Sequence, residues 1–136
     1  MSAFVVSRLV RADPHTAFDA WTKVEQLKQW WWPQWPDTIF ELDVQEGGAY
    51  TIRSAQSGAA VTGGYSEVRP GHILTFGWQW EGDPSDADTV TVLFTPDAQG
   101  LTEVTVVHVS PGRPVDPDNE QGWNDVLQRL PDSSPA

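Results

Sequence analysis

The chain of 136 residues is long enough to bury one hydrophobic core, and its 39% of hydrophobic residues argues against a disordered protein. It has no cysteine, which excludes disulfides, thiol catalysis and cysteine-ligated zinc. Nineteen acidic residues against eight basic ones give a formal net charge of −11, so we expect neither nucleic acid nor a membrane surface as a partner.

The sequence has no recognisable signal peptide and no apolar run of the ~20 residues that cross a bilayer. We therefore expect a cytoplasmic protein. We also expect a single domain over residues 1–136, ordered over about 4–130, with a frayed tail at 131–136.

The N-terminal part predicts one strand and two short helices. The strand covers Val5–Val10, and Asp13 with Pro14 marks a helix start, with Asp13 as N-cap. Thr22–Glu25 has the capping-box pattern and opens the second helix. The inner face of this helix consists of Leu27, Trp30 and Trp31. Pro33 and Pro36 are expected to end it.

Residues 30–36 contain four of the eight tryptophans of the chain. Neighbouring residues on a regular element point in different directions, so a core rarely needs three indoles in a row. The run is therefore either a helix end inserted into a core or the rim of an apolar cavity. Helical spacing favours the core, near Trp123, for Trp30 and Trp31, and leaves Trp32 and Trp35 for a rim or an exposed contact patch.

Hydrophobic alternation with a period of two predicts six further strands. They cover residues 38–44, 49–54, 61–68, 73–80, 89–95 and 101–109. Arg69–His72 has proline then glycine at the centre of a type II turn, and residues 81–88 form an acidic loop in which Asp86 and Asp88 are expected to be solvated. Hairpin-length connections predict an antiparallel sheet.

The last helix is predicted to start at Asp116–Pro117 and to end at Pro131, a length of ~21 Å. Its apolar stripe consists of Trp123, Val126, Leu127 and Leu130. Helices segregated to one side of an antiparallel sheet give an α+β fold, in which a curved sheet wraps around the C-terminal helix.

Several segments, in this order and spacing, resemble the C-terminal domain of the Hsp90 ATPase activator and its homologues. They are Leu27–Pro33, Phe40–Gly48, Gly64–Phe76, Thr102–His108 and Gln121–Leu127. The resemblance covers about residues 5–130 and implies the helix-grip fold of the START and Bet v 1-like (SRPBCC) superfamily, with two short helices after the first strand and an apolar cavity under the last helix. The family commonly has glycine where Trp32 stands, and the short last helix implies a smaller or more open cavity.

Aromatic side chains from elements that converge in such a fold are the candidates for lining a ligand cavity, unless they fill it completely. Tyr65 and His108 are added to these aromatic residues for their polar groups. The candidate ligand-binding set is Trp30, Trp31, Trp32, Trp35, Tyr65, Phe76, Trp78, Trp80, His108 and Trp123. Phe94 adds to the aromatic group without belonging to this set.

Catalytic machinery is not visible in the sequence. His15, His72 and His108 lack metal-ligand spacing, so we expect no metal and no cofactor. Only His108, Tyr65 and Arg53 could serve as polar groups in a cavity, although an exposed position on the outer face of the sheet is the simpler interpretation of Arg53.

Three functions remain open at this point, in order of preference. The first is binding of a small hydrophobic or aromatic molecule, without chemistry. The second is a protein-interaction module resembling the Hsp90 activator domain, with a chaperone or another protein as partner in a stress-related role. The third is an enzyme resembling the polyketide cyclases of the superfamily. Fold alone does not choose among them.

Overall fold

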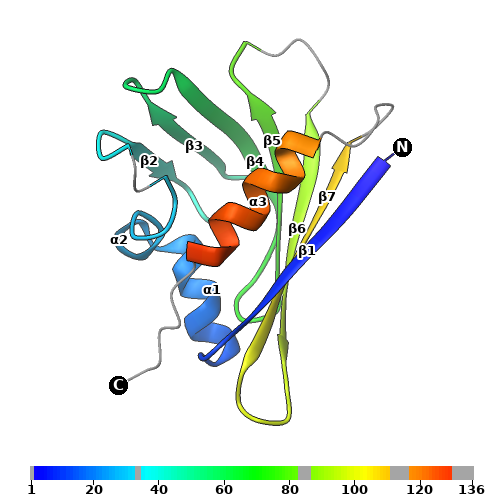
Figure 1. Ribbon diagram of the computed structural model, residues 1–136. Coiled ribbons are helices and arrows are strands. Elements are labelled where there is room, and N and C mark those ends of the chain that lie inside the picture. Colours follow the sequence, from blue (N-terminus) through cyan, green and yellow to red (C-terminus); the bar gives the residue numbers. More distant parts are fainter. Residues whose placement is uncertain (1, 33–34, 83–86, 111–116, 130–136) are drawn as a thin grey trace.

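The computed structural model describes residues 2–32, 35–82, 87–110 and 117–129 (Figure 1). In chain order its elements are β1 (Ser2–Val10), α1 (Pro14–Thr22), α2 (Val24–Leu27), β2 (Ile39–Leu42), β3 (Ala49–Ser54), β4 (Ala59–Arg69), β5 (Ile73–Trp80), β6 (Asp88–Pro96), β7 (Thr102–Ser110) and α3 (Pro117–Arg129). Of the helices described here, none combines the length and the apolar character needed to cross a membrane.

The seven strands form one antiparallel sheet in the order β1-β7-β6-β5-β4-β3-β2. Figure 1 shows α3 lying across one face of this curved sheet, with α1 and α2 beside the C-terminal end of α3. This arrangement confirms the predicted α+β helix-grip architecture. The expected helix start at Asp116 and the helix end at Leu130 and Pro131 lie outside the described residues.

Local sequence signals explain most of these elements. On β7, residues Val104, Val106 and His108 face inward because burial alternates along the strand, as the period of two predicts. The predicted type II turn is confirmed: the His72 N–H donates to the Arg69 carbonyl over 2.9 Å, and Gly71 has a φ of 77°.

The first helix begins as predicted, whereas the second does not. The Asp13 carboxylate accepts a hydrogen bond from the Thr16 N–H at 2.8 Å and so caps α1. The predicted capping box is wrong, because Thr22 is the last residue of α1 and its hydroxyl donates to the Phe18 carbonyl at 3.1 Å. Lys23 takes the N-cap position of α2 and makes no side-chain capping bond.

The helix α2 is also shorter than the tryptophan spacing predicts. It ends at Leu27, and the N–H groups of Trp30 and Trp31 both donate to the Leu27 carbonyl, at 3.2 and 3.0 Å. The two indoles therefore lie on a tight turn after the helix, and Pro33, expected to end it, lies outside the described residues. Both indoles are buried, as expected, with 0% and 4% of their surface exposed.

Trp32 adopts a left-handed backbone conformation, with a φ of 50°. This region is sterically costly for residues that carry a Cβ atom and is readily adopted by glycine. The Trp32 side chain is buried rather than exposed, packed edge-on against Trp35 at a ring-centroid distance of 5.2 Å and stacked on Trp80 at 6.0 Å. Packing of the indole thus offsets the backbone strain.

Gly63 on β4 and Gly77 on β5 leave room for the side chain of Tyr50, which reaches from β3 over β4 to β5. The register passes from Thr62 opposite Gln79 to Tyr65 opposite Phe76, and a Cβ at Gly63 would collide with the Gly77 carbonyl and approach the Tyr50 ring to 2.8 Å. The hydroxyl of Tyr50 donates to that same Gly77 carbonyl at 2.6 Å. Burial raises the pKa of both Tyr50 and Tyr65 well above the usual value near 10.

The strain at Trp32 predicts an unusual order of stability for small replacements. Both Trp32→Ala and Trp32→Gly lose the buried indole, which costs about 3–5 kcal/mol. Because glycine accepts a positive φ, we expect the glycine variant to be about 1 kcal/mol more stable to urea than the alanine variant. The matched control pair is Gln29→Ala and Gln29→Gly, at an exposed position where φ is not positive. There the alanine variant should be the more stable of the two. The same order at both positions would contradict this explanation.

The burial of the only two tyrosines predicts the alkaline limit of stability. Because the folded phenols have raised pKa values, the unfolded chain loses protons first. The contribution of each tyrosine to the free energy of unfolding is therefore constant below about pH 10 and falls above it, by up to about 1.4 kcal/mol per pH unit. Phenolate absorbance should appear together with the loss of circular dichroism, and Tyr65→Phe should lessen the slope. Reversible titration of both phenols near pH 10 in the folded protein would be inconsistent with this prediction.

Candidate functional site

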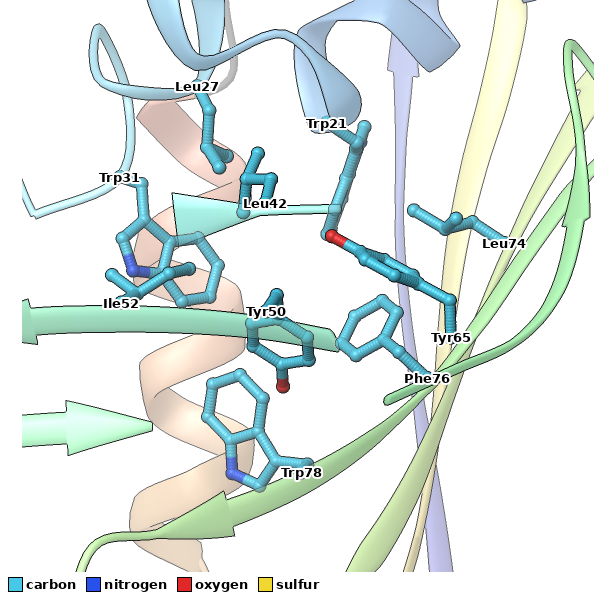
Figure 2. A pocket seen from close by; sticks show the side chains of 10 residues that line it. All are labelled: Trp21, Leu27, Trp31, Leu42, Tyr50, Ile52, Tyr65, Leu74, Phe76 and Trp78. Atoms are coloured by element: carbon cyan, nitrogen blue, oxygen red, sulfur yellow. The ribbon is translucent and has the colours of Figure 1, made fainter. Parts of the chain in front are cut away.

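The concave face of the sheet encloses a first cavity of about 30 Å³, room for about two water molecules (Figure 2). Nearly all of its lining is apolar or aromatic. The lining residues are Trp21, Leu27, Trp31, Leu42, Tyr50, Ile52, Tyr65, Leu74, Phe76 and Trp78. The side chains from α1, α2 and the central strands thus fill most of the space that the fold provides.

A second cavity, of about 80 Å³, lies between β5, the tryptophan run and α3. Its lining residues are Trp31, Trp32, Trp78, Trp80, Gly122, Trp123 and Val126. Gly122 is exposed and Trp80 is half-buried, so this cavity reaches the molecular surface beside α3. A Cβ at Gly122 would meet no other atom within 4 Å, so the backbone of α3 forms an open edge there.

The structure brings together seven of the ten predicted site residues around these two cavities. Tyr65 and Phe76 line the first, Trp32, Trp80 and Trp123 line the second, and Trp31 and Trp78 line both. Trp30, Trp35 and His108 line neither. Phe94 packs edge-on against Phe18 at 5.4 Å, away from both cavities.

Trp30 belongs to the core, where its N–H donates to the Ala20 carbonyl at 3.0 Å and its ring packs edge-on against Trp21 at 4.8 Å. Trp35 is half-buried and covers the ring of Trp32. The first cavity also contains residues that sequence reasoning did not select. Tyr50 could have been found from the strand period, since it alternates with the exposed Arg53, and Trp21 from the inner stripe of α1.

His108 connects the sheet to α3 through a buried hydrogen-bond chain. The N–H of Trp123 donates to His108 Nδ1 at 3.0 Å, and His108 Nε2 lies 2.7 Å from Asp88 Oδ2, which also accepts from the Ser110 hydroxyl at 3.0 Å. An indole N–H can only donate, so Nδ1 is the acceptor and the imidazole proton lies on Nε2, directed at Asp88. The expectation that Asp88 is solvated is wrong, since only 4% of its surface is exposed; Asp86 lies outside the described residues.

The three residues considered for chemistry are therefore separated in space. His108 is fully buried and uses both ring nitrogens in contacts, while Arg53 lies exposed on the outer face and pairs with Glu81 at 3.0 Å. Tyr65 directs its hydroxyl into the first cavity, toward Trp21 (Figure 2). Burial, with a smaller effect of the Asp43 carboxylate, raises the pKa of this phenol and keeps it protonated.

Three indole N–H groups at this site have unused hydrogen-bonding capacity. Among the described residues, the Nε1 atoms of Trp21, Trp31 and Trp78 are the buried side-chain nitrogen and oxygen atoms that have no hydrogen-bond partner. An unpaired buried donor costs about 1–3 kcal/mol, so native structures rarely leave one without a partner. All three indoles line the first cavity, and Trp31 and Trp78 also line the second.

The fold is shared with solved structures of low sequence identity. DynU16, from the dynemicin biosynthetic locus, aligns with a TM-score of 0.81 at 23% identity, over 96% of this chain and 46% of its own. The Mll3558 protein of Rhizobium loti gives 0.78 at 22% identity, over 95% and 94% of the two chains. An HSP90 activator from Plasmodium falciparum gives 0.75 at 20% identity, over 96% and 94%.

No curated protein matches the sequence significantly. The profile of one protein family does match, and it covers residues 11–133, which include the tryptophan run, strands β2 to β7 and α3. The family is described as Activator of Hsp90 ATPase homolog 1-like protein, in agreement with the resemblance of the sequence segments. The chain belongs to this family.

Proposed function

We propose that this protein binds a small hydrophobic or aromatic molecule in the second cavity, between the sheet and α3. The observation that carries the proposal is a cavity walled by five indole rings that reaches the surface beside a helical glycine. Ligand sites in proteins are concave, mostly apolar and largely preformed, with few polar groups.

The arrangement of the walls supports a flat ligand. Trp32 and Trp80 stack with an interplanar angle of 10°, and Trp123 packs on Trp78 at 5.1 Å, so aromatic rings from several elements line the cavity. Gly122 lies in the interior of the helix α3, where glycine costs about 1 kcal/mol relative to alanine. A glycine that leaves the cavity edge open offers a reason for that cost.

The volume limits how much of a ligand is enclosed. A cavity of ~150 Å³ is known to hold benzene, whereas this one measures about 80 Å³. The substituent of an aromatic ligand therefore enters the cavity, and its ring rests at the mouth, against Trp80 and the backbone at Gly122.

The other two functions have less support from the arrangement of residues. The likeness to an HSP90 activator structure, at 20% identity, is a likeness of fold alone. A cyclase-like reaction would need polar groups converging on a substrate, and Arg53 and His108 do not line either cavity.

Gly122→Leu tests the proposal by closing the mouth of the cavity. We expect acetophenone or α-methylstyrene to raise the melting temperature of the wild type and to change its tryptophan fluorescence. In the variant the affinity should fall at least tenfold, because the leucine side chain occupies the mouth. Its stability should not fall, since leucine has a higher helix propensity than glycine by about 1 kcal/mol.

The matched control is Gln128→Leu, which adds the same side chain at an exposed position of α3 that does not line the cavity. It should bind both probes like the wild type. Failure of both probes to bind the wild type, or equal binding by Gly122→Leu, would exclude the second cavity as the site.

A further inference from the structure

We propose that two copies of this chain associate through the open edge of β1, which pairs antiparallel with β1 of the second copy about a twofold axis at Val6. The two sheets thereby become one continuous sheet. No residue of β1 lines either cavity, so the inference concerns a different surface and does not rest on the proposed function.

The strand β1 is an edge strand, and within the described ranges no strand pairs with its other side. It is the first strand in the order of the sheet and is hydrogen-bonded to β7 (Figure 1). In an antiparallel pair, alternate residues direct both their N–H and their C=O to the neighbouring strand, so the remaining residues of β1 direct theirs to the open edge. Such a row of backbone donors and acceptors is a template for a further strand.

The sequence of β1 lacks the features that usually prevent an edge strand from pairing. Those features are a short strand, proline, lysine and a β-bulge, as well as a charge that points inward. The strand has nine residues, with no proline, glycine or lysine, and it runs opposite β7 in unbroken register from Ser2 to Val10. Its one charged residue, Arg8, donates to the Leu127 carbonyl of α3 at 3.0 Å, so this charge is directed at the helix and not at the edge.

The two edges of the sheet differ in how well they are protected. The exposed large hydrophobic side chains of the described residues all lie on the edge strands: Val5 and Leu9 on β1, with 59% and 47% exposed, and Ile39 on β2, with 58% exposed. The edge strand β2 has four residues and contains Glu41, and a short, charged edge is a poor template. The long, uncharged outer face of β1 therefore marks the edge that is suited to pairing.

Symmetry and charge favour a second copy as the partner. Pairing of β1 with β2 of the next copy would repeat without closing, whereas pairing of β1 with β1 closes in a twofold dimer. Because each chain carries a net charge of −11, the contact must avoid acidic side chains. The strand β1 has none, and β7 has one, Glu103, which lies opposite Leu9, three residues or about 10 Å from Val6.

Pairing about Val6 also matches the two faces of the strand. It places Val5 of one copy opposite Ser7 of the other, and it uses the whole of β1, since Ser2 then lies opposite Val10. Directly opposite residues of antiparallel strands share a face, so exposed residues meet exposed ones and buried residues meet buried ones. The exposed face of β1 consists of Ala3, Val5, Ser7 and Leu9.

Sedimentation of the wild type at increasing concentration tests the association itself. Because pairing of two strand edges buries a small area, we expect a weak dimer, with a dissociation constant of about 10–100 µM. Between about 10 µM and 1 mM the average mass should therefore rise toward twice that of a single chain. The mass of a single chain at every concentration would overturn the proposal.

Two double variants at Val5 and Ser7 test the register, because these exposed positions lie opposite each other across the axis. In Val5→Lys/Ser7→Lys two lysines face each other on both sides of the axis, and we expect the dissociation constant to rise at least tenfold. In Val5→Lys/Ser7→Glu each lysine faces a glutamate, so the association should be like that of the wild type. The matched control is Ile39→Lys, at an equally exposed valine-like position on the other edge, which should also associate like the wild type.

Amide hydrogen exchange of the wild type locates the contact without any substitution. We expect every second amide of β1, those that face the open edge, to exchange severalfold more slowly at 1 mM than at about 10 µM, because the second copy accepts their hydrogen bonds. Equal exchange of these amides at both concentrations would overturn pairing at β1, even if the chain dimerises. A dimer that Val5→Lys/Ser7→Lys leaves intact, or that both double variants weaken equally, would overturn pairing about Val6.

Discussion

The hydrogen bond from Trp123 to His108 determines where α3 lies on the sheet. It is buried at both ends, and it continues through His108 Nε2 to the carboxylate of Asp88, so that β6, β7 and α3 are linked by directional contacts as well as apolar ones. Phe4 stacks on the imidazole at 4.9 Å and orients it from β1. A shift of the helix would leave a buried donor or acceptor without a partner, at a cost of about 1–3 kcal/mol in addition to the lost apolar contacts.

A helix fixed in this way also fixes the space beneath it. The ring of Trp123 lies 5.5 Å from Trp31 and 5.1 Å from Trp78, and these two indoles stand edge-to-face between the two cavities. The inner space is largely filled, and Tyr50 uses its hydroxyl on the Gly77 carbonyl, so that region contributes core packing. The outer space keeps an open edge at Gly122. Trp31 and Trp78 therefore pack in the core on one side and line the open cavity on the other.

Sequence patterns predicted the strands, the turn at Arg69–His72 and the inward stripe of α3, because each depends on local spacing or on a local backbone preference. The predictions from sequence patterns are wrong where the structure of a residue depends on a partner that is distant in the sequence. The predicted capping box does not form, because α1 continues through Thr22. The prediction of a solvated Asp88 is wrong because its hydrogen-bond partner, His108, lies twenty positions away in the sequence. The tryptophan run was sorted correctly into buried Trp30 and Trp31, but the burial of Trp32 depends on stacking against Trp80 from β5.

Which residues line the site is easier to predict than which hydrogen bonds they make, and the indoles show why. All eight tryptophans offer the same ring and the same N–H. The Trp30 N–H donates to the Ala20 carbonyl, whereas the N–H of Trp31, one position later, has no acceptor among the described residues. Along the turn after α2, the indole of Trp30 packs against Trp21 of α1, whereas that of Trp31 packs against Trp78 of β5 and Trp123 of α3. The two indoles are buried to a similar degree, but only one of them is paired, so the spacing that predicts burial does not predict hydrogen bonding.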